Sequence, residues 1–477
     1  MGIGASAGGL EAFSELLTHL PSNTGLAFVF IQHLDPRHES LLTELLQQRT
    51  GMKVQTAANE MKPEPNCVYV IPPNVSMEIE NRTLRLSSRP AGAQQMPIDC
   101  FFRSLAADLG TQAIGVVLSG SASDGTLGLK AIKGEGGITF AQEPASASFD
   151  SMPRSAIVAE CVDLVLTPAG IAQELVRIKQ HPYVSDPDMT RARADQERDF
   201  SEVLNILRST SAVDFSMYKP GTIRRRIYRR MALHKLETPG DYVRFLRERH
   251  GEAEALFQDL LIHVTAFFRE PATFQALHDR VFPALFPNRG AEEPIRVWIP
   301  GCSTGEEAYS VAMSIQEFLF ETGVNIAAQI FGTDLSDRAL ERARAGLYPE
   351  SISADVSADR LRTFFTKVNG HYQISRNIRD MCIFARQNVT KDPPFSHLDL
   401  LMCRNLLIYL GPGLQKKMMK VFHYALKPSG FLVLGISESI GGSSDLFSPI
   451  DRTLKIYTRK AAPSPSGVNF ESHDNAG

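Results

Sequence analysis

Short apolar runs alternate with amphipathic helical segments in two separate parts of the chain. In the first part, apolar residues recur at helical spacing over residues 10–20, and a solid apolar run follows at residues 26–31. Further candidate strands lie at residues 114–118 and 162–166, with a candidate helix at residues 101–109. Alternating strands and helices favour a parallel sheet that is covered on both faces. We therefore expect the first part to be an α/β domain.

The same alternation returns in the last part of the chain. Candidate strands lie at residues 295–299, 329–332, 381–385, 398–402 and 431–436. Between the two parts, residues 200–286 are helical in pattern throughout, and residues 347–379 are long and irregular enough to hold a small inserted subdomain. We expect an α/β protein with two doubly wound parallel-sheet domains separated by a small all-helical domain. The second sheet is expected to carry a small β insertion.

Changes in composition indicate where these domains end. Residues from about 180 to 197 lose apolar periodicity and gain Pro, Asp and Arg, which is typical of a linker. We predict a first α/β domain at 1–182, a linker at 183–199, a helical domain at 200–288, a second α/β domain at 289–460 with its insertion at 347–379, and a disordered tail at 461–477. Met1 lies only a few residues before the first glycine turn, so we expect a very short first strand and either a trimmed start or a missing upstream strand or domain.

Bulk properties exclude several classes of protein. The formal charge of -3 disfavours nucleic acid as a partner, and no apolar run approaches the roughly 20 residues of a membrane span. The N-terminus lacks the basic start and apolar middle of a signal peptide. The 6 cysteines are scattered without a C-x-x-C pair, which favours reduced thiols over disulfides or a zinc site. We expect a cytoplasmic protein with no membrane insertion and no metal site.

Three polar side chains follow three candidate strands of the first part. Ser6 lies in the turn GASAGG, which joins a strand to a helix. His33 follows the run at residues 26–31, and Asp124 follows residues 114–118 in the stretch SGSASDG. Parallel strands end at one edge of a sheet, where ligands bind, so we expect these side chains to share an edge.

Each of these residues has an ordinary explanation when it is taken alone. The spaced glycines around Ser6 could form a phosphate or dinucleotide loop, a lone histidine is more often structural, and an aspartate before glycine is usually a turn residue. Together, however, the three supply a nucleophile, a base and an orienting acid. In that interpretation Ser6 protrudes, and the backbone N–H groups that follow it stabilise an anion.

A family resemblance supports the second interpretation. The stretches GIGASAGGLEAF, IQHLD and SGSASDGTLG, with GGIT and SMPR further on, resemble the catalytic domain of the chemotaxis protein-glutamate methylesterases over roughly residues 1–180. The resemblance implies that Ser6 attacks a glutamyl methyl ester, that His33 acts as general base and then acid, and that Asp124 orients His33. The implied products are receptor glutamate and methanol. The order Ser, His, Asp differs from that of the α/β-hydrolases.

A glycine turn and an acid mark a second site in the last part of the chain. The stretch RVWIPGCSTGEE is a strand, a glycine turn and a helix start that contains Glu306 and Glu307, and the next strand ends near Asp334. An acid at that place suits the ribose hydroxyls of a nucleoside. NAD and S-adenosylmethionine both fit, although the turn lacks the third glycine of the dinucleotide fingerprint. Glu306 and Glu307 could instead stabilise the helix N-terminus.

A second resemblance decides between these cofactors. The stretches TAFFREP, RQNV, CRNLLIY and PGCSTGEEAYS resemble the chemotaxis-receptor glutamate methyltransferases over about residues 200–460. The resemblance implies S-adenosylmethionine as cofactor, with Arg269 and Tyr409 orienting the substrate carboxylate near the reacting methyl group. The implied cofactor contacts are Thr265, Arg269, Glu306, Asp334, Asn388, Val389 and Arg404. His263 departs from the asparagine that is frequent in the family. Without the resemblance, Arg269 would be interpreted as a surface salt bridge and Tyr409 as a core aromatic residue.

The basic stretch RRRIYRR at residues 224–230 also has two interpretations. It could be a solvated helix face, as most charge runs are. It could also attract the glutamate-rich methylation helices of receptors, which the resemblance favours.

We therefore expect a bifunctional enzyme that methylates receptor glutamates and hydrolyses the resulting esters, with methyl-accepting chemotaxis-type receptors or related signalling proteins as partners. Glutamate is already ionised near neutral pH, so methyl transfer needs positioning and exclusion of water rather than a general base. Two alternatives remain: a degenerate sensory scaffold with one or neither activity, and a nucleotide-dependent oxidoreductase. The oxidoreductase leaves Ser6, His33 and Asp124 unexplained. The presence of every expected catalytic residue type argues against the scaffold.

Overall fold

The computed structural model of the chain describes residues 1–32, 42–88, 96–181, 183, 196–286 and 293–461. The chain divides into two compact units. Unit 1 comprises Met1–Val213 and Ile223–Val264, and unit 2 comprises Asp214–Thr222 and Thr265–Gly477. The predicted tail and most of the predicted linker lie outside the described residues.

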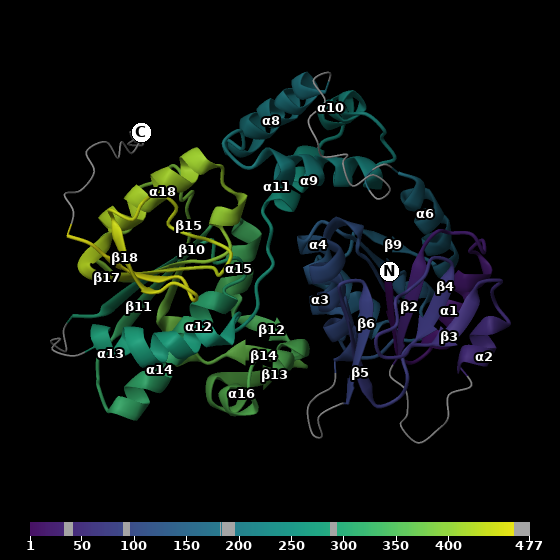
Figure 1. Cartoon of the computed structure of the whole chain (residues 1–477), viewed down its shortest axis with the longest axis horizontal. Helices are drawn as coiled ribbons and strands as arrows, with labels where there is room; N and C mark the ends of the chain where they lie inside the picture. The colour runs from purple at the N-terminus through teal and green to yellow at the C-terminus, as the bar shows by residue number, and fades with distance from the viewer. Residues whose placement is uncertain (33–41, 89–95, 182, 184–195, 287–292, 462–477) are drawn as a thin grey trace. The chain divides into compact units, whose positions relative to one another are not determined.

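Unit 1 is built on a 7-stranded sheet in which every neighbouring pair of strands is parallel (Figure 1). From edge to edge the strands are β3 (Lys53–Thr56), β4 (Cys67–Val70), β2 (Ala27–Gln32), β1 (Gly2–Ala5), β7 (Ile114–Val117), β8 (Ile138–Gln142) and β9 (Leu164–Leu166). The central strands β1, β7 and β8 are buried along their whole length, which is why they consist of small and apolar residues almost without alternation. A separate antiparallel hairpin, β5 (Val75–Glu80) and β6 (Thr83–Ser88), was not predicted.

Helices cover both faces of this sheet. Phe101 of α3 and Leu129 of α4 share one core cluster with Val29 of β2. Phe13 of α1 stacks on Phe30, with 4.3 Å between ring centroids, and consecutive strand residues point to opposite faces. The helices and 3-10 turns of this part are α1 (Gly9–Thr18), α2 (Leu42–Gln47), α3 (Pro97–Leu109), η1 (Gly110–Gln112), α4 (Thr126–Gly134), η2 (Pro144–Ser146), α5 (Ser151–Val158) and α6 (Pro168–Gln180).

The helical segment is divided between the two units. Helices α8 (Glu197–Ser211), α9 (Pro220–Leu233), α10 (Pro239–Glu248) and α11 (Glu252–Leu260) lie wholly or mainly in unit 1, while α12 (Pro271–Ala276), the π-turn η3 (Leu277–Val281) and α13 (Phe282–Leu285) lie in unit 2. Local sequence explains why α10 begins at Pro239. The side chain of Thr238 accepts a hydrogen bond from the N–H of Asp241 over 3.2 Å, and Pro239 occupies the first helical position.

Unit 2 is built on a second 7-stranded sheet (Figure 1). Its order is β15 (Cys382–Arg386), β11 (Ala328–Asp334), β10 (Ile295–Pro300), β16 (Leu398–Cys403), β17 (Leu426–Leu434), β19 (Ile456–Arg459) and β18 (Phe447–Asp451). The first five strands are parallel. Its helices are α14 (Glu306–Thr322), α15 (Asp337–Ala345) and α18 (Pro412–Ala425), with the 3-10 turn η5 (Leu407–Tyr409).

A small antiparallel sheet is inserted between α15 and β15. It consists of β12 (Leu347–Pro349), β14 (His371–Ile374) and β13 (Phe365–Val368), accompanied by η4 (Glu350–Ala354), α16 (Ala358–Phe364) and α17 (Arg376–Asp380). The predicted fold class, with two parallel-sheet domains, a helical region and a β insertion, is confirmed.

One detail of the second sheet differs from the prediction of a wholly parallel sheet. β19 runs antiparallel to both β17 and β18. The connection between β18 and β19, at residues 452–455, is too short for the crossover that a parallel pair requires. The sheet is therefore mixed at this edge.

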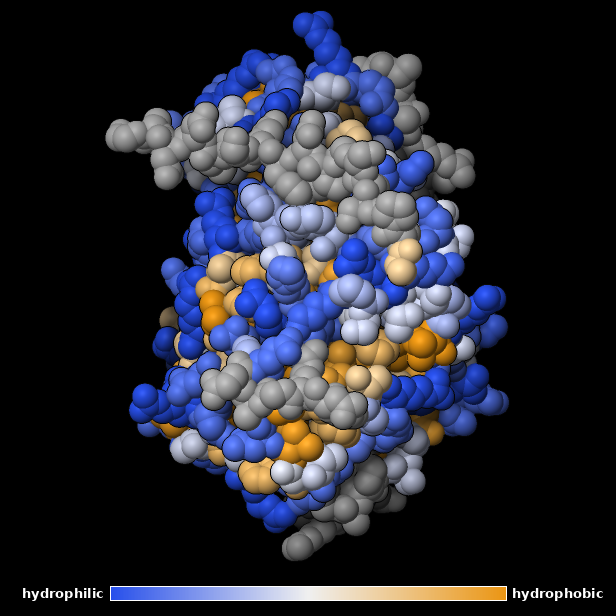
Figure 2. Space-filling model, turned by 90° about the vertical axis from the view of Figure 1, so that its left-hand side faces the viewer, coloured by the Kyte–Doolittle hydropathy of each residue, from blue (hydrophilic) through white to orange (hydrophobic). Residues whose placement is uncertain are grey.

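The surface seen in Figure 2 is mostly hydrophilic, with hydrophobic residues gathered in several separate areas. Among the residues that the structure describes, none of the helices combines the length and the apolar character needed to cross a bilayer.

Candidate functional site

Ser6 lies where the sheet of unit 1 reverses its strand order. β1 is the first strand along the chain, with β2 on one side and β7 on the other. Ligands of open α/β sheets bind at such switch points, beyond the carboxyl ends of the strands. Ser6 directly follows β1, and its backbone N–H donates to the carbonyl oxygen of Ser119, which follows β7, over 3.0 Å. The turns after β1 and β7 are thus joined at this edge.

Two glycines make room for the turn that holds Ser6. Gly8 has a φ of +71°, and a Cβ there would lie 2.7 Å from Ser119 Oγ. A Cβ on Gly120 would lie 2.6 Å from Met152 Cε and 3.0 Å from the Cβ of Ser6. A larger residue at either position would displace the turn, so the local geometry requires glycine at both.

Asp124 is buried, and the N-terminus of α3 binds its carboxylate. Its two oxygens accept hydrogen bonds from the backbone N–H groups of Ile98 and Asp99, over 3.0 Å and 2.9 Å. Asp99 in turn accepts from the N–H of Gly128 over 2.7 Å, at the start of α4. The Asp124 carboxylate is therefore held in one orientation by a helix end.

His33 lies outside the described residues, and its role stays a prediction. The strand that precedes it does lie beside the Ser6 turn, because Gln32, the last residue of β2, is in register with Ala5, the last residue of β1.

Sequence reasoning did not single out Ser119, whose hydrogen bonds join the Ser6 turn to Phe149 and Gln142. Its Oγ donates to the carbonyl of Ala7 over 2.8 Å and accepts from the N–H of Phe149 over 3.0 Å. Its backbone N–H donates to Gln142 Oε1 over 2.9 Å. The available signal was its position directly after a buried strand.

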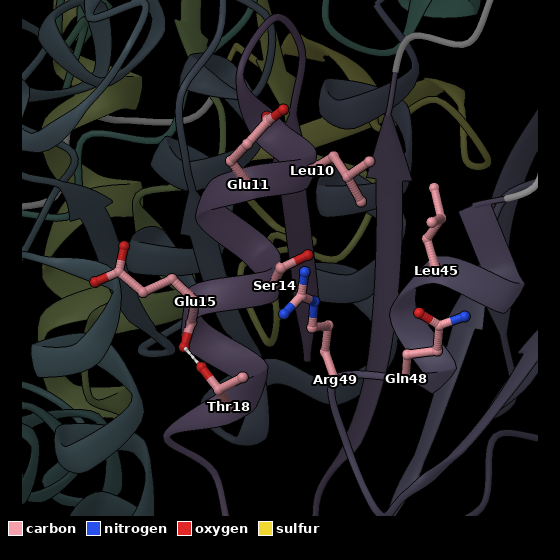
Figure 3. Close-up of a pocket in the computed structure, with 8 residues that line it drawn as sticks. All are labelled: Leu10, Glu11, Ser14, Glu15, Thr18, Leu45, Gln48 and Arg49. Atoms are coloured by element: carbon pink, nitrogen blue, oxygen red, sulfur yellow. Dashed lines mark hydrogen bonds between the residues drawn. The ribbon is translucent and has the colours of Figure 1, made fainter.

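A surface groove of about 390 Å³ lies further along α1, between α1 and the end of α2 (Figure 3). It is lined by Leu10, Glu11, Ser14, Glu15, Thr18, Leu45, Gln48 and Arg49. The close-up shows Arg49 extending toward Ser14. None of the predicted site residues lines this groove, so it is separate from the Ser6 turn.

The basic stretch at residues 224–230 lies in α9, and two of its arginines are buried inside unit 1. Arg226 donates to the carbonyl oxygens of Lys133, over 2.8 Å, and of Gly134. Arg229, whose side chain has 0% exposure, donates to the carbonyl of Gly137 and pairs with Asp163 and Asp259. For these two residues both interpretations, a solvated helix face and a receptor-docking surface, are wrong, because their side chains are buried. Arg225 remains exposed, and Arg224 and Arg230 pair with Glu197 and Glu252.

The buried ion pair between Arg229 of α9 and Asp163 predicts that the stability of the folded state depends on pH. Burial alone would raise the pKa of Asp163, but the charges of Arg229 and Lys133 outweigh it, and the pKa is lowered from 3.8 to about 2. A lowered pKa stabilises the folded state above the unfolded pKa, and this stability is lost as the pH falls through the folded pKa. At about 1.4 kcal/mol per pKa unit, we expect about 2 kcal/mol to be lost between pH 3.8 and 2.

This expectation can be measured by acid unfolding, followed by far-UV circular dichroism, of the wild type and the Asp163→Asn variant. The variant should lose this part of the acid dependence. Asp150→Asn is the control, because Asp150 forms an exposed pair with Arg154. Identical acid profiles for the wild type and Asp163→Asn would contradict the assignment.

The second candidate site lies at the switch point of the sheet in unit 2. β10 is flanked by β11 on one side and β16 on the other, and the chain order reverses between β10 and β16. The glycine turn after β10 is tied to the end of β11, since the N–H groups of Gly301 and Cys302 donate to the carbonyl of Thr333 over 2.7 Å and 3.0 Å. A Cβ on Gly305 would lie 2.9 Å from the Cβ of Ala343, so glycine permits α14 and α15 to approach.

Asp334 ends β11 and is directed at the glycine turn. Its Oδ2 accepts from the backbone N–H of Ser303 over 2.9 Å, and its Oδ1 accepts from Ser336 over 2.9 Å. Asn388 follows the neighbouring strand β15, and Gln387 donates its N–H to the carbonyl of Asp334 over 3.1 Å. The predicted acid and the Asn388 segment are therefore brought to the same end of the sheet.

Arg404 differs in its setting from an ordinary ligand contact. Its guanidinium, with 0% side-chain exposure, pairs with Glu270 over 2.7 Å and Glu307 over 3.2 Å, and it donates to the carbonyl of Arg269 over 2.7 Å. Burial raises the pKa of Glu307, while the charge of Arg404 lowers it, and the net direction is upward. These contacts of Arg404 join the start of α14 to residues 269–270, in the stretch TAFFREP that contains the predicted residues Thr265 and Arg269.

The remaining predicted residues lie on the loops around this switch point. Glu306 opens α14 and accepts from Thr304 Oγ1 over 2.6 Å. Arg269 and Thr265 are partly exposed and lie on the segment before α12 rather than on a helix. Val389 packs against the core cluster beneath the β16 loop. Tyr409 closes η5 and is partly exposed, unlike a core aromatic residue.

The residues around the switch point fit a polar nucleoside cofactor. Four of their buried polar atoms have no hydrogen-bond partner among the described residues: Ser303 Oγ, Glu307 Oε1, Arg404 Nε and Asn405 Oδ1. Ser303 and Glu307 lie in the turn and helix start that follow β10, and Arg404 and Asn405 directly follow β16. Buried polar atoms are normally paired, so such a cluster indicates a place where a polar ligand is bound.

Comparisons with known proteins agree with this geometry. The CheB methylesterase family matches residues 1–175, the all-alpha domain of the CheR methyltransferases matches residues 198–261, and their SAM-binding domain matches residues 263–456. The chemotaxis protein methyltransferase of Vibrio parahaemolyticus is 31% identical over 54% of this chain and 94% of its own length.

Two further proteins are similar to parts of this chain that include residues of unit 1. An uncharacterized 104.1 kDa protein of Rhodobacter capsulatus is 37% identical over 87% of this chain, which spans 46% of that relative's length. The crystal structure of the Thermotoga maritima CheB methylesterase catalytic domain is 26% identical, covering 37% of this chain and 95% of that domain, with a TM-score of 0.35.

Proposed function

Because the chain belongs to the CheB methylesterase family through residues 1–175 and to the CheR methyltransferase family through residues 198–261 and 263–456, we propose that it adds and removes methyl groups on glutamate side chains of chemotaxis-type receptors. The observation that carries the proposal is the presence of two separate switch points. One has a serine after its central strand, and the other has a glycine turn facing Asp334.

At the first site, we assign ester hydrolysis to Ser6, His33 and Asp124. Ser6 Oγ attacks the ester carbonyl while His33 takes its proton, and Asp124 orients the imidazole. The bond between the acyl carbon and the methoxy oxygen then breaks, and His33 returns the proton to that oxygen, which leaves as methanol. Water then hydrolyses the acyl-enzyme by the same route, which regenerates Ser6 and releases the glutamate carboxylate. The fixed orientation of Asp124 on α3 supports its role.

At the second site, we assign cofactor binding to Thr265, Arg269, Glu306, Asp334, Asn388, Val389 and Arg404. S-adenosylmethionine, when bound, supplies an electrophilic methyl group on a positively charged sulfur. Asp334 accepts hydrogen bonds from the ribose hydroxyls, and Arg269 and Tyr409 orient the incoming carboxylate. The guanidinium of Arg404 also holds Glu270 and Glu307 in place, at the starts of α12 and α14.

We also propose the division into an esterase domain at 1–182, a linker at 183–199, a helical domain for substrate recognition at 200–288, and a methyltransferase domain at 289–460. We place the protein in the cytoplasm, a reducing compartment that suits its free cysteines, with methyl-accepting chemotaxis-type receptors or related signalling proteins as partners. Exposed Arg225 is the arginine of α9 still available to an acidic receptor helix.

The proposal is tested by incubating the full chain with methyl-labelled S-adenosylmethionine and receptor-containing membranes. Alkali-labile label should appear on the receptor and then as volatile methanol. Receptor whose methylation-helix glutamates are replaced by alanine is the control and should stay unlabelled. A receptor that takes up no label under these conditions would overturn the transferase half of the proposal.

A further inference from the structure

Glu438 is a buried acid that none of the assigned roles uses. It follows β17 and is 5% exposed. Its Oε2 accepts hydrogen bonds from the backbone N–H groups of Gly435, over 2.8 Å, and Asn405, over 2.9 Å. Its Oε1 accepts from the N–H of Ile408 over 3.2 Å. One carboxylate thus joins the end of β17 to the loop that follows β16.

The β16 loop needs such a support because of its conformation. Asn405 has a φ of 58°, in the left-handed region, and residues held there persist only when their surroundings determine them. Its N–H points to Glu438 rather than along a helix or strand. On the other side, a Cβ on Gly435 would lie 2.9 Å from Glu438 Oε2 and 3.1 Å from the nitrogen of Asn405, so glycine allows this close approach.

Backbone N–H groups are the donors to the Glu438 carboxylate. Burial raises the pKa of Glu438 and outweighs the N–H groups of Gly435, Asn405 and Ile408, which lower it, so the net direction is upward. The neighbouring guanidinium of Arg404 is bound to Glu270 and Glu307 instead. The two systems therefore fix different parts of the same loop: Arg404 its beginning, and Glu438 the residues just before Tyr409.

From this geometry we propose that Glu438 is a positioning residue for methyl transfer, which holds residues 405–408 so that Tyr409 stands at the reacting carboxylate. The inference rests on the proposed transferase function. Glu438 acts through the loop after β16, whereas Asp334 ends β11, which lies on the other side of β10 from β16 and β17.

Glu438→Gln tests this role, because it keeps the size of the side chain but turns one acceptor oxygen into a donor. At least one of the backbone N–H groups then faces an NH2 group. We expect kcat for methyl transfer to fall about 10-fold to 100-fold, since displacements near 1 Å have effects of about that size. The dissociation constant for S-adenosylmethionine should stay within about 3-fold, because Asp334 and the glycine turn keep their contacts.

Asp399→Asn is the matched control. Asp399 is equally buried and accepts from the backbone N–H of Arg296 over 2.8 Å, but it begins β16 at the opposite end of the sheet. It should keep kcat even if its melting temperature falls. Glu438→Asp, one methylene shorter, gives a second variant, and an intermediate fall in kcat is expected.

The outcomes separate this inference from the proposed function. A wild type that transfers methyl groups, with a Glu438→Gln variant whose kcat is within 3-fold of it, would overturn the positioning role alone. So would a loss of cofactor affinity equal to the loss of kcat, or an equal loss of kcat in Asp399→Asn. A wild type with no transfer to any receptor would overturn the proposed function, and this inference with it.

Discussion

Replacing Ser6 by alanine should abolish hydrolysis of receptor methyl esters by unit 1 and leave methyl transfer by unit 2 intact. The Ser6 hydroxyl is the only group at the β1 turn to which we assign attack on the ester carbonyl, and its loss removes the covalent route. Loss of a nucleophile from such a triad lowers kcat by several orders of magnitude, leaving only the contribution of binding and anion stabilisation. We expect a fall of at least about 1,000-fold, measured as methanol released from receptor that was methylated beforehand.

Ser14→Ala is the control for Ser6→Ala. It makes the same chemical change on α1, the helix that follows the Ser6 turn, in the groove away from that turn. It should hydrolyse ester like the wild type. Equal methanol release by the wild type and Ser6→Ala would remove Ser6 from the mechanism.

Asp334→Ala should abolish cofactor binding. The carboxylate accepts the N–H of Ser303 in the glycine turn and is assigned to the ribose hydroxyls as well, so its loss removes both the ligand contact and the support of the turn. A hydrogen bond to a charged group contributes about 1.5–3 kcal/mol. Losing two such bonds to the ribose raises the dissociation constant by at least about 100-fold, to values that calorimetry would register as absence of binding.

Asp337→Ala controls for the change in charge. Asp337 is exposed in the first turn of α15, and its removal should leave the dissociation constant unchanged. Melting curves of both variants show whether unit 2 stays folded. Unchanged affinity in a folded Asp334→Ala variant would exclude Asp334 from the site.

The elements that were predicted correctly from the sequence are those that a local pattern of apolar and polar residues defines. Each buried central strand is an apolar run that ends in a polar turn, and that is why Ser6 and Asp334 could be placed at strand ends before any coordinates were known. The antiparallel edge of the second sheet was missed because the strand pairing of β19 depends on neighbours in space. The hairpin of β5 and β6 was missed for the same reason.

The arginines of α9 illustrate what local pattern cannot supply. A run such as RRRIYRR is typical of a solvated surface, yet Arg226 and Arg229 are buried because carbonyl oxygens near Gly134 and the carboxylate of Asp163 receive them. Those acceptors lie far away in the sequence, and only the tertiary fold brings them to α9. Glu438 went unnoticed for a related reason, since its partners are backbone N–H groups, which every residue carries and which leave no signal in the sequence.

Mixing two variants that each lack one of the two activities tests most directly whether one chain carries both. Ser6→Ala should methylate receptor without releasing methanol, and Asp334→Ala should hydrolyse esters without making them. Incubated together with receptor membranes and labelled S-adenosylmethionine, they should restore continuous methanol release, which neither variant produces alone. A mixture that releases no methanol, while the wild type does, would contradict two independent sites, and a wild type that releases none would favour the degenerate scaffold.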